Sequence, residues 1–397
     1  MTDLLETRAR RFLESISAEG AGSLEALGGP ERQLEAMLPR GAVRPEMQNL
    51  VEKTAEKIIA REQLNPPEQF ALEAIIIPDK RPPVPIANGD YQVEHPLWLH
   101  LNEDSARKKI RPALPSIGRI ELPGHPSYPY GGTGFVVGDG LLMTNRHVAE
   151  IFCGGLGNRG LVFRPGHRAG IDFKREVTGG SLYFEVVEVM LIHPYWDMAL
   201  LRVEGLPDTV VPLSLSLKTP AEIKDSEIVV IGYPAFDPRN NASVQNEVFG
   251  GIYDVKRLMP GKLTGEAAVA SFGKSVPSAK HDSSTLGGAS GSAAIAVETG
   301  EVVALHFSGV YLESNYGVPT AALACDNRVT DLGLNFSGTP EGRSGPWDEW
   351  WRIAGSEAAG ISVAVSDQSK SSPSASTADD GASASWTIPI DISVKVG

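Results

Sequence analysis

Short apolar and alternating runs follow one another through the middle of the chain, and they determine the expected fold class. The runs include "SIGRIELP", "GTGFVVGDGLLMTN", "SLYFEVVEVMLI", "MALLRVEGL", "EIVVIGYP", "AAIAVET" and "EVVALHFSG". Each run is β-branched or alternates apolar with polar positions, and Gly, Pro or Asp separates it from the next. This spacing, with few helix signals between the runs, predicts an all-β sandwich or barrel. We assign this β domain to residues 114–335.

The chain on either side of the β domain has a different pattern. Residues 3–17 and 46–63 repeat apolar positions at helical spacing, which predicts a small α-helical module over 1–65. Prolines interrupt residues 66–113, where we expect an irregular connector. After the β domain we predict a helical extension over 336–365, a Ser-rich linker over 366–385 and a C-terminal strand over 386–397.

Composition and charge narrow the class of protein. Of the 397 residues, 42% are hydrophobic, which is enough for a sizeable core. A net charge of −13 argues against nucleic acids and anionic membranes as partners, because both need a basic surface. No apolar run reaches the roughly 18–20 residues that span a bilayer, and the N-terminal residues lack the apolar core of a secretory signal. We therefore expect a cytoplasmic protein.

Metal and disulfide chemistry receive little support from the sequence. Cys153 and Cys325 do not make a disulfide framework in a chain of this length, and neither has the spacing of a metal ligand. His95 and His100 lie five positions apart in a proline-rich segment, which is a weak metal pattern. We expect reduced thiols and no metal or cofactor.

The stretch "SSTLGGASGSAAI", residues 283–295, is the strongest candidate for chemistry. A serine hydroxyl is a poor nucleophile and needs a base directed at it, together with backbone N–H groups directed at the oxyanion that forms. Ser290 lies among small residues that permit such a tight turn. We predict Ser290 as the nucleophile and the N–H groups of Gly288 and Ser290 as the oxyanion hole. By itself, however, a Gly- and Ser-rich loop is weak evidence.

Two further residues complete a catalytic set. His147 follows two strand-like runs in "GTGFVVGDGLLMTNRHVAE", and an imidazole is the side chain best suited to accept and return a proton near neutral pH. Asp197 precedes the apolar run "MALLRV", where a carboxylate could orient the imidazole. The order His, Asp, Ser excludes the α/β-hydrolase arrangement and matches the order found on chymotrypsin-type β-barrels.

The motifs "GTGFVVGDGLLMTNRHV", "HPYWDMALLRV", "STLGGASGSAAI" and "GEVVALHFSG" together resemble trypsin-like (chymotrypsin-fold) serine endopeptidases, in particular the bacterial branch that includes glutamyl endopeptidases. The resemblance covers roughly residues 115–335. It implies two antiparallel six-stranded β-barrels, with His147 and Asp197 on the first and Ser290 on the second. It also implies hydrolysis of peptide bonds in protein or peptide substrates through an acyl-enzyme intermediate.

The same resemblance suggests how a substrate would be bound. Thr285 and His306 stand where glutamyl endopeptidases bind an acidic P1 side chain, although a packed core histidine is an equally good interpretation of His306. The segment His306, Phe307, Ser308 and Gly309 is expected to pair with the substrate backbone. Some of those enzymes also use the free N-terminal amine of the mature protein, and here more than a hundred residues precede the β domain, so we expect no such amine at the site without cleavage of the chain.

Ala289 departs from the family pattern. Animal trypsins have an aspartate at this position and bacterial relatives usually have an asparagine, so we expect packing alone to hold the loop around Ser290. The departure leaves room for a second hypothesis, a weakly active or inactive protease fold that recruits protein partners. The helical module over 1–65 carries no identifiable chemistry, and we interpret it as a regulatory or recruitment module for a protein partner.

Overall fold

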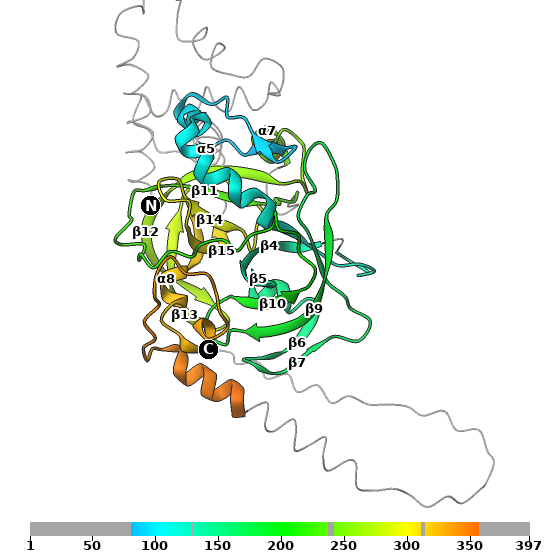
Figure 1. The fold of residues 1–397 in the computed structure, drawn as a ribbon, viewed down its shortest axis with the longest axis vertical. Helices are drawn as coiled ribbons and strands as arrows, with labels where there is room; N and C mark the ends of the chain where they lie inside the picture. The colour runs from blue at the N-terminus through cyan, green and yellow to red at the C-terminus, as the bar shows by residue number, and fades with distance from the viewer. Residues whose placement is uncertain (1–80, 129, 237–241, 311–313, 357–397) are drawn as a thin grey trace, which may run out of the picture.

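The computed structural model describes residues 81–128, 130–236, 242–310 and 314–356 (Figure 1). The predicted helical module over 1–65, the Ser-rich linker and the C-terminal strand lie outside the described residues. The described chain is mainly β, as the spacing of the apolar runs predicts.

One half of the molecule is a closed barrel of six antiparallel strands. The strands pair in the order β10-β5-β4-β3-β8-β9. They span Ile117–Glu121 (β3), Tyr130–Gly138 (β4), Leu141–Thr144 (β5), Gly170–Asp172 (β8), Tyr183–Ile192 (β9) and Ala199–Val203 (β10). A separate hairpin, β6 (Cys153–Leu156) and β7 (Arg159–Phe163), extends from this barrel. The short helix α6 (Arg146–Ala149) follows β5.

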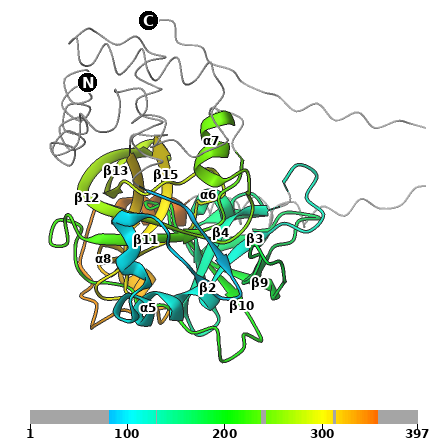
Figure 2. The same ribbon diagram turned by 90° about the horizontal axis from the view of Figure 1, so that it is seen from above.

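The other half is an eight-stranded sheet in the order β11-β14-β15-β16-β13-β12-β1-β2, with an additional pairing of β11 with β12. Six of its strands are Glu227–Gly232 (β11), Arg257–Ser271 (β12), Lys274–His281 (β13), Ala293–Ala296 (β14), Val302–Val310 (β15) and Ser314–Pro319 (β16). The structure therefore establishes one six-stranded barrel and a sheet, whereas the sequence predicts two barrels. Figure 2 shows the two halves beside each other.

Alternation along the strands explains how one chain fills three hydrophobic cores. In β4, Val136 points into the barrel core, whereas Phe135 and Val137 join the core shared with the sheet. In β11, Ile228 points into the core of the sheet, and Val229 into the shared core. Since side chains alternate with a period of two, a strand buried on both faces is apolar at successive positions, as in the run "IVVI" inside β11.

The segment 81–116 is ordered, although we expect an irregular connector over 66–113. It forms the strands β1 (Val84–Ala87) and β2 (Asp90–Tyr91), the 3₁₀ helices Pro96–Asn102 and Arg111–Ser116, and the helix α5 (Asp104–Ile110). β1 pairs with β12, and Ile86, Trp98 and Leu101 are buried in the shared core. Within 81–113 the expectation of irregular chain is thus wrong, because packing on the sheet fixes short elements between the prolines. The domain boundaries themselves stay predictions.

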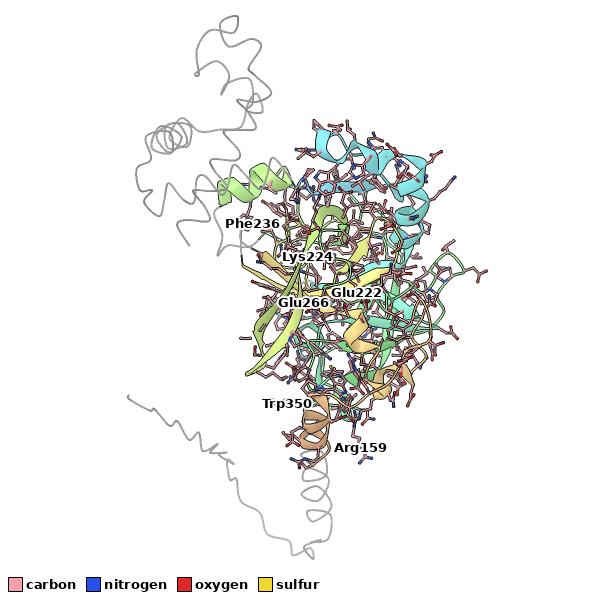
Figure 3. All side chains as sticks on the ribbon, turned by 90° about the vertical axis from the view of Figure 1, so that its left-hand side faces the viewer. Arg159, Glu222, Lys224, Phe236, Glu266 and Trp350 are labelled. Atoms are coloured by element: carbon pink, nitrogen blue, oxygen red, sulfur yellow. The ribbon has the colours of Figure 1, made fainter. Side chains whose placement is uncertain are left out.

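Three more short helices are α7 (Ala242–Phe249), α8 (Thr320–Leu323) and α9 (Asn327–Thr330). Along the chain, α7 lies between β11 and β12, and α8 and α9 follow β16. Of the helical extension predicted over 336–365, residues 347–356 are helical, and this C-terminal helix carries Trp350 (Figure 3). None of the helices in the described ranges is long and apolar enough to cross a membrane.

Candidate active site

His147 and Asp197 are in direct contact at one end of the barrel. His147 stands on α6, and Asp197 lies in the turn before β10. The Nδ1 atom of His147 lies 2.7 Å from Oδ2 of Asp197, and the backbone N–H of His147 donates to Oδ1 at 3.0 Å. Asn145 Nδ2 donates to the Asp197 carbonyl oxygen at 2.9 Å. The Asp197 side chain is 5% exposed and that of His147 is 39% exposed, so a buried carboxylate holds a ring that solvent still reaches.

The charge on Asp197 sets the basicity of His147. Burial would lower the pKa of His147, but the hydrogen bond to Asp197 and the negative charges of Asp197 and Glu150 raise it above its ordinary value. An imidazole with a raised pKa is a stronger base, and its charged form is stabilised by the adjacent carboxylate. This pair can therefore take up a proton from a neighbouring hydroxyl.

Ser290 lies in a tight double turn between β13 and β14. The Ala289 N–H donates to the Leu286 carbonyl oxygen at 3.1 Å, and the Ser292 N–H donates to the Ala289 carbonyl oxygen at 3.0 Å. Gly288 has φ +80, and a Cβ atom there would lie 2.5 Å from the Tyr233 carbonyl oxygen. Both the conformation and the space at position 288 therefore require glycine.

Hydrogen bonds from two other segments hold this loop. The Thr133 N–H donates to the Ser290 carbonyl oxygen at 2.8 Å, and Thr133 Oγ1 donates to the Gly288 carbonyl oxygen at 3.0 Å. The Ala235 N–H donates to the Gly287 carbonyl oxygen at 2.6 Å. The expectation that packing alone holds the loop is thus wrong, although the Ala289 methyl group is indeed fully buried.

The orientation of the loop leaves two N–H groups directed away from these anchors. Carbonyl and N–H of a trans peptide point in opposite directions. Anchoring the Gly287 carbonyl oxygen on Ala235 therefore turns the Gly288 N–H to the other side. Neither the Gly288 N–H nor the Ser290 N–H has an acceptor within the described part of the chain. Two free N–H groups in one turn are the feature that an oxyanion hole requires.

The Ser290 loop lies against the end of the strand that leads to His147. A Cβ atom at Gly291, which has φ +88, would overlap the Thr133 carbonyl oxygen and lie 2.8 Å from Oγ1 of Thr144. Thr144 is the last residue of β5, three positions before His147. No hydrogen bond joins the Ser290 hydroxyl to the His147 ring among the described residues, and such catalytic contacts are often long without a substrate.

Comparison with known proteins identifies the family. The family described as a trypsin-like peptidase domain matches residues 132–305. Probable serine protease FE772_23060 of Lysobacter enzymogenes is 30% identical over 307 residues, which cover 69% of this chain and 78% of that protein. The chain belongs to the trypsin-like serine peptidases. It is a serine endopeptidase of that family.

Solved structures give weaker matches to this trypsin-like peptidase. The active form of the Rv3671c protease from M. tuberculosis is 19% identical, with a TM-score of 0.41, covering 66% of this chain and 95% of that one. The HtrA-type protease AlgW with a decapeptide is 15% identical, with a TM-score of 0.38, covering 58% of this chain and 67% of that one.

The predicted specificity residues of the peptidase have different hydrogen-bond partners. His306 is 3% exposed, and its Nδ1 atom lies 3.2 Å from Nε2 of His281, which is equally buried. Burial lowers the pKa of both rings, that of His281 to about 3. The Gly291 N–H donates to the His306 carbonyl oxygen at 2.8 Å, which ties His306 to the Ser290 loop. Thr285 instead donates from Oγ1 to Oδ1 of Asn315 at 2.5 Å, and no hydrogen bond links it to His306 in the described chain.

The end of β15 has one unpaired edge within the described chain. β14 pairs with β15 only as far as the Ala293–Leu305 pair, whereas β16 pairs with Ser308, Gly309 and Val310 on the other side. Ser308 and Gly309 are exposed, and Phe307 is buried. The backbone of Ser308 and Gly309 is therefore available to another strand.

Sequence reasoning misses the residues that position this site. Thr133 and Asn145 stand inside the quoted motif "GTGFVVGDGLLMTNRHV", but only the folded chain brings Thr133 to Gly288 and Asn145 to Asp197. Their position beside glycines and next to a candidate base is a weak signal. Nothing local in the sequence connects them to their partners.

Proposed function

We propose that this peptidase cleaves peptide bonds through Ser290, His147 and Asp197. Ser290 Oγ attacks the substrate carbonyl carbon while its proton passes to Nε2 of His147. His147 then returns that proton to the leaving amine, which releases the first product and leaves an ester on Ser290. Water hydrolyses the ester in the same way, with His147 again as base and then acid.

The contact between His147 and Asp197 carries this proposal. Because Nδ1 is held 2.7 Å from a buried carboxylate, the proton stays on Nδ1 and the lone pair on Nε2 is free to accept the serine proton. Asp197 also stabilises the imidazolium that forms, as the raised pKa of His147 indicates. The N–H groups of Gly288 and Ser290 would stabilise the oxyanion, and one such donor typically lowers the barrier by roughly 3 kcal/mol.

Labelling with a fluorophosphonate tests the assignment. The intact protein should gain one adduct, located on Ser290 by mass spectrometry, and the adduct should be lost in Ser290→Ala and His147→Ala. Ser337→Ala, which changes an exposed serine outside the site, should be labelled like the wild type. A folded wild-type protein without an adduct would contradict the proposal and would favour the non-cleaving module that recruits protein partners.

We further propose that the fold contains the second barrel expected for this family. β11 pairs with β14 at one side and with β12 at the other, so hydrogen-bonded neighbours run from β11 through β14, β15, β16, β13 and β12 back to β11. The unpaired edge of Ser308 and Gly309 lies on this ring beside the Ser290 loop. A substrate strand adding there would place its scissile carbonyl near Ser290.

An acidic P1 residue, as in glutamyl endopeptidases, is the substrate preference that we propose. His306 supports it, because His281 occupies Nδ1 of His306 and leaves Nε2 as the nitrogen for a ligand. A carboxylate would accept from that nitrogen and would favour the charged ring. The Thr285 hydroxyl would have to turn away from Asn315 to add a second hydrogen bond.

Matched peptides with Glu, Gln, Asp or Leu at P1 test the preference. We expect Glu to exceed Gln by about tenfold or more in kcat/KM, the effect of one charge-assisted hydrogen bond. His306→Gln should abolish the difference between Glu and Gln. Equal cleavage of the Glu, Gln and Leu peptides by the wild type would exclude a preference for an acidic P1 residue and leave the triad assignment unaffected.

A further inference from the structure

The turn that presents Asp197 is held from inside by a buried histidine. His193 follows β9 and is fully buried. The Nδ1 atom of its ring accepts the backbone N–H groups of Tyr195 and Trp196, each at 3.0 Å. The backbone N–H of His193 donates to the Met198 carbonyl oxygen at 2.9 Å. These three bonds span residues 193–198. They fix the backbone up to the residue immediately before Asp197.

The accepted hydrogen bonds determine the protonation of His193. A nitrogen that accepts two N–H groups must carry its lone pair, so the ring proton resides on Nε2. Nε2 lies 3.2 Å from Oδ2 of Asp326 and therefore donates to it. Burial lowers the pKa of His193, which agrees with a neutral ring in this tautomer.

Asp326 connects this histidine to the C-terminal helix. Its carboxylate is fully buried just before α9, where Oδ1 accepts the backbone N–H of Arg328 at 3.0 Å and its Nη1 at 3.2 Å. Oδ2 accepts Nε1 of Trp351 at 2.7 Å, and the Trp351 ring packs edge-on against His193 with centroids 5.3 Å apart. Burial would raise the pKa of Asp326, but these hydrogen bonds lower it, so the carboxylate is charged.

We infer that Asp326, His193 and Trp351 act as a positioning network that holds the Asp197 carboxylate against His147. A charged carboxylate that accepts from four donors has a fixed orientation. It fixes the His193 ring, and the ring in turn holds the backbone of the turn before Asp197. The C-terminal helix thereby becomes part of the support of the active site. This inference rests on the proposed roles of Asp197 and His147.

Four variants separate positioning from packing. Trp351→Phe keeps the aromatic ring and removes the Nε1 donor, and Asp326→Asn places an amide N–H₂ among donors. His193→Asn keeps a hydrogen-bond acceptor near the position of Nδ1. His193→Gln places its amide near the position of Nε2, where it can donate to Asp326, and loses the acceptor at Nδ1. Asp331→Asn, at an exposed position after α9, is the matched control.

The first measurement is the low-field proton NMR signal of the His147 Nδ1–H bound to Asp197, assigned by its loss in His147→Gln. It does not depend on a reactive serine. The second is the rate of fluorophosphonate labelling. We expect Asp326→Asn and His193→Gln to lose the low-field signal and to be labelled roughly 10- to 100-fold more slowly, because small misplacements cost about that much. His193→Asn and Trp351→Phe should be affected less, and Asp331→Asn not at all.

The two measurements distinguish the possible failures. A folded wild type with the low-field signal but no labelling would contradict the proposed function. The positioning network could still be tested, because the NMR signal of each variant can be measured without a reactive serine. Folded Asp326→Asn and His193→Gln variants with wild-type signal and rate would overturn the inference. If Asp326→Asn does not fold, the two His193 variants decide between positioning and packing. Positioning predicts a faster labelling rate for His193→Asn than for His193→Gln, whereas a packing role predicts equal losses for the two.

Discussion

At the scale of single residues, the basicity of His147 depends on a carboxylate rather than on the fold at large. Burial lowers the pKa of His147 and Asp197 raises it, and Asp197 prevails. A base must be deprotonated to act, so reactivity should be lost as the pH falls through a value above about 6.5, the usual pKa of histidine. The acidic limb of the pH profile thus reports the charge on Asp197.

Asp197→Asn should change both the rate and the pH profile. Without the carboxylate only the lowering effect of burial and the smaller effect of Glu150 remain, so the acidic limb should move to lower pH. The rate of fluorophosphonate labelling at neutral pH should fall by about 10³- to 10⁴-fold, as in other triads that lose this residue. Glu150→Gln should move the limb slightly in the same direction with little loss of rate. An unshifted limb in Asp197→Asn would contradict the assignment of His147 as the titrating base.

Thr133 holds the loop around Ser290 through its side-chain hydroxyl. Its Oγ1 donates to the Gly288 carbonyl oxygen at 3.0 Å and accepts the Tyr233 N–H at 3.2 Å. Thr133→Val preserves the shape and removes both bonds. We expect labelling to slow by roughly 10-fold, since a hydrogen bond contributes about 1 kcal/mol and its loss leaves buried partners unsatisfied. Thr264→Val, in the sheet, should keep the wild-type rate, and equal rates for the two variants would count against Thr133.

The residues of the site differ in how visible they are in the sequence. His147, Asp197 and Ser290 each lie in a motif whose local pattern indicates a role. The contact between His147 and Asp197 is expected once the order His, Asp, Ser along the chain is compared with that of chymotrypsin-type barrels. Thr133, His193 and Asp326 act across separations of 100–155 positions, as in Thr133 to Tyr233 and His193 to Asp326, and no local pattern encodes such pairs.

At the scale of elements, the hairpin of β12 and β13 has an unusual turn. Ser271 pairs with Lys274, so the two central residues are Phe272 and Gly273, with φ +46 and φ +75. Such a turn favours Asn-Gly, and a non-glycine residue in the left-handed region costs about 1–2 kcal/mol. The Phe272 ring lies under the Arg146 guanidinium, 3.9 Å from its centroid to Cζ, beside His147. The strained conformation of Phe272 thus occurs where its ring contacts Arg146 and joins the sheet to α6.

Phe272→Asn should separate stability from reactivity. Asparagine suits the turn, so the thermal midpoint should stay constant or rise. Loss of the cation–π contact should reduce the labelling rate about 2- to 5-fold, in proportion to the 0.5–1 kcal/mol of an exposed pair. Val162→Asn, on the exposed hairpin of β6 and β7, should change neither the midpoint nor the rate. A variant that is less stable but fully reactive would show that Phe272 serves only the fold.

Strands that contain a continuous apolar run can be predicted from the sequence, whereas elements fixed by tertiary contacts cannot. "MALLRV" and "EIVVIG" become β10 and β11 because their apolar content suits strands buried on both faces. Residues 84–116 contain four prolines and too few alternating positions to predict elements, yet Ile86 and Trp98 fix these elements by burial against the sheet. The pairing of β1 with β12 depends on that burial.

At the scale of the whole molecule, three histidines are held neutral inside the fold. His193, His281 and His306 are all at least 97% buried, and burial lowers the pKa of each. In the unfolded chain they titrate near 6.5. Below that pH the unfolded chain therefore binds protons that the folded chain excludes, which makes the free energy of unfolding fall as the pH falls. His147 has a raised pKa, so its contribution is fully present below 6.5 and does not offset this loss.

Acid should consequently destabilise the protein well before its carboxylates are protonated. Each excluded proton contributes up to about 1.4 kcal/mol per pH unit, so urea unfolding followed by tryptophan fluorescence should show a loss of up to about 4 kcal/mol between pH 6 and pH 5. His281→Gln removes one of the three groups and keeps a side chain that can bond to His306. Its stability should fall less steeply over the same interval, by up to about 1.4 kcal/mol per pH unit. Identical slopes for the variant and the wild type would mean that His281 binds a proton in the folded protein as readily as in the unfolded chain, which would contradict the neutral His281 ring that burial implies.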